Sequence, residues 1–170
     1  MKKIVTVLVV VMGLMLTGKS TNAQNKIGYV SMQELITAMP EYKKADTAMN
    51  EFQTALGQNY DDMVKEYNEQ SVLVTGKDTA KFTAAQLELK RKAVGDLLQK
   101  LQGWQTQAQQ LAQQKNQELI APIQKKALDA IQTVAKENGY TYIIQKEQLL
   151  VSPPGEDILP LVKKKLGINK

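Results

Sequence analysis

The sequence predicts an α+β fold in which a long antiparallel α-helical hairpin stands on a small β body. Apolar residues recur every three or four positions over two long stretches, and a glycine-containing break at 75–79 separates the stretches. Short β-prone runs lie at both ends of this helical region. We therefore expect residues 41–138 to form a hairpin arm with its tip at about 75–79, and residues 24–40 and 139–170 to form the body.

The first 23 residues have the layout of a secretory signal peptide. Two lysines precede an apolar run at 4–16, and a small, polar stretch then ends at Ala23. Because the run has 13 residues and a membrane-spanning helix needs roughly 20, cleavage after Ala23 is favoured over a membrane anchor. The chain has no cysteine to carry a lipid. We expect an exported protein that consists of a single unit, 24–170.

The composition excludes several kinds of chemistry. The chain has no Cys and no His, which rules out disulfides, thiol catalysis and Ser-His dyads. We find no metal-ligand cluster, carboxylate pair or phosphate-binding glycine loop, and therefore predict no catalytic residue, no metal and no cofactor. The formal charge of +5 falls to +2 once the three lysines of the leader are removed. Since an exported protein does not meet the chromosome, we expect no nucleic-acid partner.

The body begins with a strand and a short helix. Residues 26–30 place β-prone side chains at alternate positions, which is typical of a strand. Ser31 and Glu34 then have the spacing of a capping box, in which each side chain bonds a free amide of the helix start. Pro40 ends this helix after Met39, because the residue before a proline avoids the helical conformation.

Two long amphipathic helices follow, at 41–74 and 79–138. The seam of the first consists of Tyr42, Ala45, Met49, Phe52, Leu56, Tyr60, Met63 and Tyr67. The seam of the second consists of Val94, Leu97, Leu101, Trp104, Ala108 and Leu111, and resumes at Ile120, Ile123, Ala127, Ala130 and Val134. Pro122 predicts a kink or a break in the second helix, and Asn138-Gly139 predicts its end.

The turn between the helices is predicted at Gly76, which can adopt a conformation closed to other residues. Thr79 or Asp78 is the expected N-cap of the second helix. At 1.5 Å per residue the helices extend about 51 Å and about 90 Å, so the C-terminal part of the longer one must pack elsewhere.

The C-terminal region predicts two more strands and a helix. Residues 140–145 and 148–151 are β-prone, and the intervening Lys146-Glu147 is a poor two-residue turn. Residues 152–155, with two prolines and a glycine, predict a loop, and an amphipathic helix is expected from Glu156 to Leu166.

A body of this size rarely buries enough apolar surface to be stable alone, which favours a homo-oligomer. The alternative is a monomer whose hairpin folds over its strands. Our candidates for the oligomeric body are Ile27, Tyr29, Tyr142, Ile144, Leu149 and Val151.

The two ends of the chain resemble the Skp/OmpH family of periplasmic chaperones. The residues that carry the resemblance are Lys-Ile-Gly-Tyr-Val-Ser at 26–31, the sequence 131–140 leading into 142–144, and the closing segments 149–151 and 157–159. The resemblance implies a periplasmic homotrimer in which strands of three subunits form the β body. Three hairpins would hang from it as coiled-coil tentacles around a cavity that holds unfolded outer-membrane proteins without ATP. It also implies anionic lipid, including lipopolysaccharide, as a further partner.

Charge is sorted between the two helices of the arm. Residues 41–78 carry four basic and eight acidic side chains, whereas residues 79–126 carry eight basic and three acidic ones. The two helices either attract each other across the hairpin, or the basic one faces a client or an anionic surface. Our candidate client-binding residues are Lys77, Lys81, Lys90, Arg91, Lys92 and Lys100, with Met63 and Tyr67 from the seam.

Three glycines lie inside the predicted arm helices: Gly57, Gly95 and Gly103. Glycine costs roughly 1 kcal/mol relative to alanine in a helix interior. These glycines either loosen the arm for larger clients or allow close helix packing. The alternative function is a structural coiled-coil protein that spaces or tethers components of the envelope.

Overall fold

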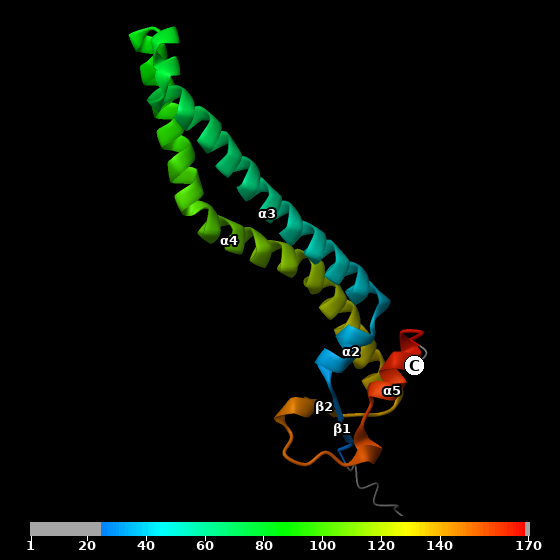
Figure 1. Ribbon diagram of the computed structural model, residues 1–170. Helices are drawn as coiled ribbons and strands as arrows, with labels where there is room; N and C mark the ends of the chain where they lie inside the picture. The colour runs from blue at the N-terminus through cyan, green and yellow to red at the C-terminus, as the bar shows by residue number, and fades with distance from the viewer. Residues whose placement is uncertain (1–24, 169–170) are drawn as a thin grey trace, which may run out of the picture.

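The computed structural model describes residues 25–168, and the predicted signal peptide lies outside the described residues. The fold is α+β, as predicted, and consists of a long helical hairpin on a small body (Figure 1). The elements in chain order are β1 (Ile27–Val30), α2 (Met32–Ala38), α3 (Pro40–Thr75), η1 (Lys77–Lys81), α4 (Ala84–Glu137), β2 (Tyr142–Gln145), η2 (Lys146–Gln148), η3 (Pro154–Glu156) and α5 (Leu159–Lys165). None of the helices within residues 25–168 has the length and apolarity of a membrane span.

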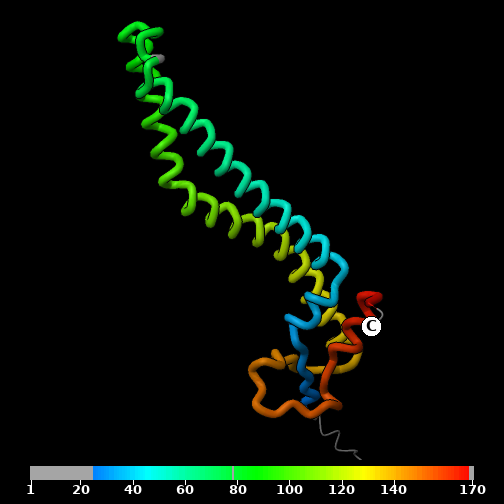
Figure 2. Tube along the Cα trace, in the orientation of Figure 1, coloured from blue at the N-terminus to red at the C-terminus, as the bar shows by residue number. Residues whose placement is uncertain are grey.

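The arm consists of α3 and α4, which run antiparallel and extend away from the body (Figure 1). The alternative in which the hairpin folds over the strands is therefore wrong for this chain. Because α4 has 54 residues and α3 has 36, the C-terminal part of α4 continues past the start of α3 and packs against α2 and α5 in the body. Figure 2 shows α4 bowed away from α3 in its middle, whereas α4 runs through Pro122 without a break.

The tip of the arm differs from its prediction in three ways. The N-cap of α4 is Thr83 and not Thr79 or Asp78, because Thr83 and Gln86 form a reciprocal capping box. The residues between the helices form the short 3₁₀ helix η1. Gly76 is extended, with φ −88° and ψ −173°, so that it needs no special backbone conformation. A Cβ there would lie 2.8 Å from the carbonyl oxygen of Val72, and close approach is thus what requires the glycine.

The start of the body follows the prediction closely. β1 is followed by the N-cap Ser31, whose Oγ accepts a hydrogen bond from the backbone N–H of Glu34. The expected return bond is absent among the described residues, because the Glu34 carboxylate binds Lys146 instead. Pro40 occupies the first turn of α3, where its missing N–H leaves no bond unmade.

The sheet has two strands, β1 and β2, which pair in parallel with Gly28 opposite Ile143. Parallel pairing requires a crossover connection, and the whole arm forms it. The predicted strand at 148–151 is wrong for the single chain. After β2 the chain forms η2, and residues 149–153 follow without pairing to any strand of the described chain.

The hydrophobic core lies where the arm joins the body. It contains the fully buried Leu35 and Met39 from the region of α2, and Ile158 and Val162 from the region of α5. The end of α4 covers them with Ile123, Ala127, Ala130, Ile131 and Val134. α5 begins three residues later than predicted, because η3 precedes it and the Asp157 carboxylate accepts the Leu159 N–H at 2.9 Å.

Candidate functional site

The seam of the arm is only half-buried. From residue 46 to 73 in α3 and from 84 to 122 in α4, no described side chain is buried. The predicted seam residues of α4 from Val94 to Leu111 are all half-buried, as are Met63 and Tyr67 in α3, whereas Tyr60 is exposed. The seam predicted from the spacing is thus present, but much of its apolar surface remains in contact with water.

The three glycines of the arm are not sites of close helix packing. A Cβ built at Gly57, Gly95 or Gly103 would meet no atom within 4 Å. The packing interpretation is therefore wrong, and these glycines weaken the helices without bringing them closer together.

The predicted cations lie toward the tip and along the first half of α4. Lys77 and Lys81 belong to η1, and Lys90, Arg91, Lys92 and Lys100 belong to α4. Lys90 Nζ lies 4.9 Å from the centre of the Phe82 ring, which attracts the ammonium group through its π electrons.

Charge attraction between the two helices is concentrated at the root of the arm. Among the described side chains, the one ion pair that joins α3 to α4 is Glu41–Lys126. No described carboxylate lies within ion-pair distance of residues 90–92 or of Lys100. The electrostatic pairing expected along the whole hairpin is therefore not formed by these cations. Arg91, Lys92 and Lys100 are exposed, whereas Lys90 is half-buried beside the Phe82 ring.

Two hollows meet at Leu89, which the sequence analysis missed. One, of about 440 Å³, lies between the helices and is lined by Glu66 and Gln70 of α3 and by Leu89, Lys90, Ala93, Asp96, Leu97 and Lys100 of α4. The other, of about 850 Å³, is lined by Ala85, Glu88, Leu89, Arg91 and Lys92. Leu89 is 70% exposed. The sequence contains a signal for this exposure: Leu89 follows Leu87 by two residues, which places the two leucines on opposite sides of the helix. Leu87 is half-buried.

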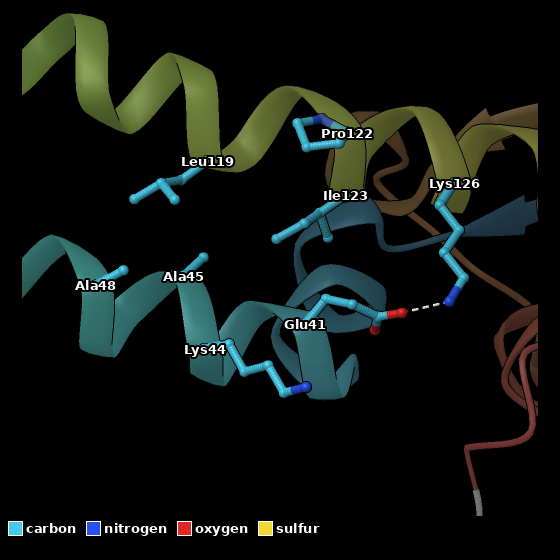
Figure 3. Close-up of a pocket in the computed structure, with 8 residues that line it drawn as sticks. All are labelled: Glu41, Lys44, Ala45, Ala48, Leu119, Pro122, Ile123 and Lys126. Atoms are coloured by element: carbon cyan, nitrogen blue, oxygen red, sulfur yellow. Dashed lines mark hydrogen bonds and ion pairs between the residues drawn. The ribbon is translucent and has the colours of Figure 1, made fainter.

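A third groove, of about 440 Å³, lies at the root of the arm (Figure 3). Leu119 and Ile123 point from α4 toward the small side chains Ala48 and Ala45 of α3, and Pro122 and Lys44 complete the lining. Glu41 and Lys126 close one end with their ion pair. The hydrogen bond from Lys126 is the main cause that lowers the pKa of the Glu41 carboxyl.

The β2 side of the sheet is open and bordered by exposed apolar residues. Within the described chain β2 pairs only with β1, whereas the far edge of β1 meets Asp157. Tyr142 is 58% exposed and Val151 80% exposed, Leu150 is fully exposed, and Ile27 is exposed as well. Ile144 and Leu149 are half-buried. Tyr29 differs from the others, because it is 5% exposed and buried within the chain itself.

No group of acidic side chains within residues 25–168 could hold a metal ion. The arrangement instead offers apolar surface, cations and an unpaired strand edge, which are features of binding to other polypeptides.

The comparisons with known proteins agree with this geometry. The family model described as outer membrane protein (OmpH-like) matches residues 26–166. The chain is also similar to a crystal structure described as an OmpH-like outer membrane chaperone from Caulobacter crescentus CB15. The TM-score is 0.66 and the sequence identity 14%, with 88% of each chain covered, so that this likeness establishes a shared fold. No match is found among curated proteins.

Proposed function

This chain belongs to the OmpH-like family of outer membrane proteins, and from that premise we propose that it is a chaperone for outer-membrane proteins. In this proposal it is a holdase: it binds unfolded outer-membrane proteins in the periplasm without ATP and prevents their aggregation. It is not an enzyme and needs no cofactor. It reaches the periplasm through the signal peptide at 1–23, which is cleaved after Ala23.

The observation that carries the proposal is the chemistry of the arm. A hairpin of 36 and 54 helical residues projects from the body, yet from 46 to 73 and from 84 to 122 it buries no described side chain. Half-buried apolar residues such as Met63 and Tyr67 suit weak, adaptable contacts with many apolar segments. Weak contacts spread over a long surface are what a protein needs to hold chains of different sequence.

The cations of the arm supply the second kind of client contact. In the proposal Lys77, Lys81, Lys90, Arg91, Lys92 and Lys100 face the client. Electrostatic attraction between this surface and acidic segments would speed the capture of a chain before it aggregates. The same surface would also attract anionic lipid or lipopolysaccharide, and a vesicle-binding measurement separates these partners from the client.

A cavity exists only if subunits associate, and we propose a homotrimer built through the body. The open edge of β2 and the exposed apolar residues Ile27, Tyr142, Leu150 and Val151 favour this assembly, because an unpaired edge is a template for another strand. Ile144 and Leu149 would join them. Tyr29 supports the interface from within the core of its own subunit.

Aggregation of an outer-membrane β-barrel protein diluted from urea tests this function, combined with light scattering on the mixture. We expect a trimer that suppresses aggregation and forms a complex of one trimer with one client chain. Ile144→Asp places a charge in the proposed interface and should dissociate the trimer and abolish suppression.

The second candidate is a structural coiled-coil protein that spaces or tethers envelope components, and the length of the arm favours it. A dimeric rod without effect on client aggregation would support this function and contradict the holdase.

A further inference from the structure

A short joint carries the chain from the arm into the sheet. It consists of residues 138–141, between the end of α4 and the start of β2 (Figure 1). The Gly139 N–H lies 3.4 Å from the carbonyl oxygen of Lys136. The Tyr140 N–H donates to the carbonyl oxygen of Ala135 over 2.9 Å. Together with the φ of 71° at Gly139, these two bonds form a Schellman motif, so that the joint has a defined geometry.

The joint also fixes where the sheet begins. The Tyr140 ring packs against the backbone of β1, since a Cβ at Gly28 would lie 2.8 Å from it. Lys26 Nζ lies 4.1 Å from the centre of the same ring and donates to the carbonyl oxygen of Asn138 over 3.1 Å. The Thr141 N–H donates to the carbonyl oxygen of Lys26 over 2.7 Å. A change in the backbone of the joint is therefore passed on to the pairing of β1 with β2.

Asn138 and Gly139 form the one Asn-Gly pair of the sequence. The backbone nitrogen that follows an asparagine can attack the side-chain Cγ, and glycine favours this attack because no Cβ crowds its nitrogen. Both residues are exposed, and a Cβ at Gly139 would meet no atom within 4 Å. The surroundings therefore leave room for the five-membered ring that the attack forms.

The asparagines of the arm lack this combination. Asn50, Asn59, Asn68 and Asn116 are exposed as well, but each precedes a residue with a long or aromatic side chain. They also lie inside α3 or α4, where the helical hydrogen bonds hold the next backbone N–H. They are thus internal references for the reactivity of the joint.

The folded backbone restrains the reaction without excluding it. Asn138 has φ −108° and ψ 7°, and its Nδ2 donates to the carbonyl oxygen of Val134 over 2.8 Å. Its backbone N–H donates to the same oxygen over 3.0 Å. These bonds must open before the ring can close. Helix ends open at a small cost in free energy, so the reaction proceeds through local fraying of α4 and does not require global unfolding.

We infer that Asn138 is a site of spontaneous deamidation, and that its isoaspartate product loosens the joint between the arm and the sheet. The Gly139 nitrogen loses its proton and bonds to Asn138 Cγ, the Cγ–Nδ2 bond breaks, and the amide leaves as ammonia with that proton. Water then opens the resulting succinimide. Opening at Cγ gives aspartate, and opening at the main-chain carbonyl carbon gives isoaspartate. This chemistry needs only water and is independent of the proposed function.

The two products affect the joint differently. Aspartate has no side-chain donor for the carbonyl oxygen of Val134, and its carboxylate lies at the negative end of the α4 dipole. Isoaspartate places Cβ and Cγ in the main chain and so lengthens it by a carbon. The bonds from Gly139 and Tyr140 to the last turn of α4 cannot then both be kept, and Tyr140 loses its place against Gly28.

Mass spectrometry of the folded, mature protein after prolonged incubation at neutral pH tests the site. Trypsin cleaves after Lys136 and Lys146, so that Asn138 is the sole asparagine of its peptide. We expect Asn138 to convert at least about tenfold faster than Asn50 or Asn116 in the same sample, because only the helix end opens readily. Fragmentation should identify isoaspartate beside aspartate. Conversion at Asn138 no faster than at Asn116 would overturn the inference.

Gly139→Asn is the matched variant for the chemistry. Asparagine also adopts the left-handed conformation at a helix end, so the cap is kept while a Cβ is added beside the attacking nitrogen. Conversion at Asn138 should slow at least about threefold in this variant, with unchanged helix content by circular dichroism. Equal conversion in the variant and the wild type would contradict attack by the Gly139 nitrogen.

The consequence for the joint is tested by comparing fresh and aged wild type, which requires no variant. Hydrogen exchange of the amides at 140–143 should be faster in the fraction that carries isoaspartate, whereas exchange at the middle of α3 should not change. Aged Gly139→Asn should exchange at 140–143 like its own fresh sample. Equal exchange at these amides in fresh and isoaspartate-containing wild type would contradict a loosened joint.

Discussion

The root of the molecule and its arm contain similar apolar residues but use them differently. At the root, Leu35, Met39, Ile158 and Val162 are fully buried. Side chains from the regions of α2, α4 and α5 surround them. Along the arm, two helices meet through a single seam, and from 46 to 73 and from 84 to 122 no described side chain is buried. A side chain in a two-helix seam has a neighbour on one side and water on the other.

Under the proposed function, this difference would divide stability, at the root, from binding, along the arm. The root buries its apolar side chains completely, as the close-packed core of a uniquely folded protein does. The arm leaves apolar and cationic surface accessible and has glycines in its helices that make no close contact. A surface that must accept many clients benefits from side chains that are not committed to a core.

The largest expected difference between the two regions is in the cost of truncating a leucine. Leu35→Ala at the root should lower the free energy of unfolding by about 2–5 kcal/mol, whereas Leu101→Ala in the seam should cost about 1 kcal/mol, because its side chain is only half-buried. Urea denaturation at fixed protein concentration measures both. Equal losses would mean that the arm is packed as tightly as the root.

The glycine at the root should respond to an added methyl group by losing stability. A Cβ at Gly28 would lie 2.8 Å from the Tyr140 ring and 3.0 Å from Ile158, so that Gly28→Ala should cost about 1–3 kcal/mol. Gly155→Ala is the matched control in the body, because a Cβ there meets nothing within 4 Å. The comparison uses the thermal midpoints of the two variants, and a Gly28→Ala midpoint no lower than that of the control would contradict the close approach.

The glycines of the arm should show the opposite sign. Gly95→Ala and Gly103→Ala add no contact within 4 Å and should each stabilise the arm by about 1 kcal/mol through helix propensity. Slower hydrogen exchange in α4 would report this gain. If the glycines serve flexibility, the double variant should also hold a narrower size range of clients. An unchanged size range in a stiffened arm would refute that role.

The smallest expected effect concerns the ion pair between Glu41 of α3 and Lys126 of α4, at the root of the arm. Lys126 lowers the pKa of Glu41, so this carboxylate contributes stability above pH 4.5 that is lost as the pH falls through the folded pKa. Since both side chains are more than a third exposed, the contribution is below about 1 kcal/mol. The stability difference between wild type and Glu41→Gln should therefore shrink toward zero on acidification. Glu118→Gln is the control, because its pair with Lys115 lies within α4.

Periodic features were predictable from the sequence, whereas features that depend on one contact were not. The seam from Val94 to Leu111 follows from spacing alone and is present. The cap of α4 was misplaced because Asp78, Thr79 and Thr83 are all good caps. Only Thr83 has a glutamine three residues later, and this spacing is the signal in the sequence that distinguishes Thr83 from the other two.

The predicted strand at 148–151 illustrates a different limit of sequence interpretation. Its residues favour extended backbone, and the backbone at Leu149 is extended. A strand also needs a partner, however, and the described chain provides none for this segment. Leu89 was not predicted for a related reason: it lies outside the periodic seam, and its place beside two hollows depends on the tertiary structure.

The claim that the arm binds clients and the body assembles subunits is tested most directly by a matched reversal of charge. Lys90, Arg91 and Lys92 lie consecutively in the arm, and Lys163, Lys164 and Lys165 lie consecutively in α5 of the body. Replacing either triplet with glutamates changes the net charge equally. The affinity for an unfolded outer-membrane β-barrel protein, measured at one salt concentration, should fall at least about tenfold for the arm variant and change little for the body variant. Equal affinities in the two variants would contradict the division of work between arm and body.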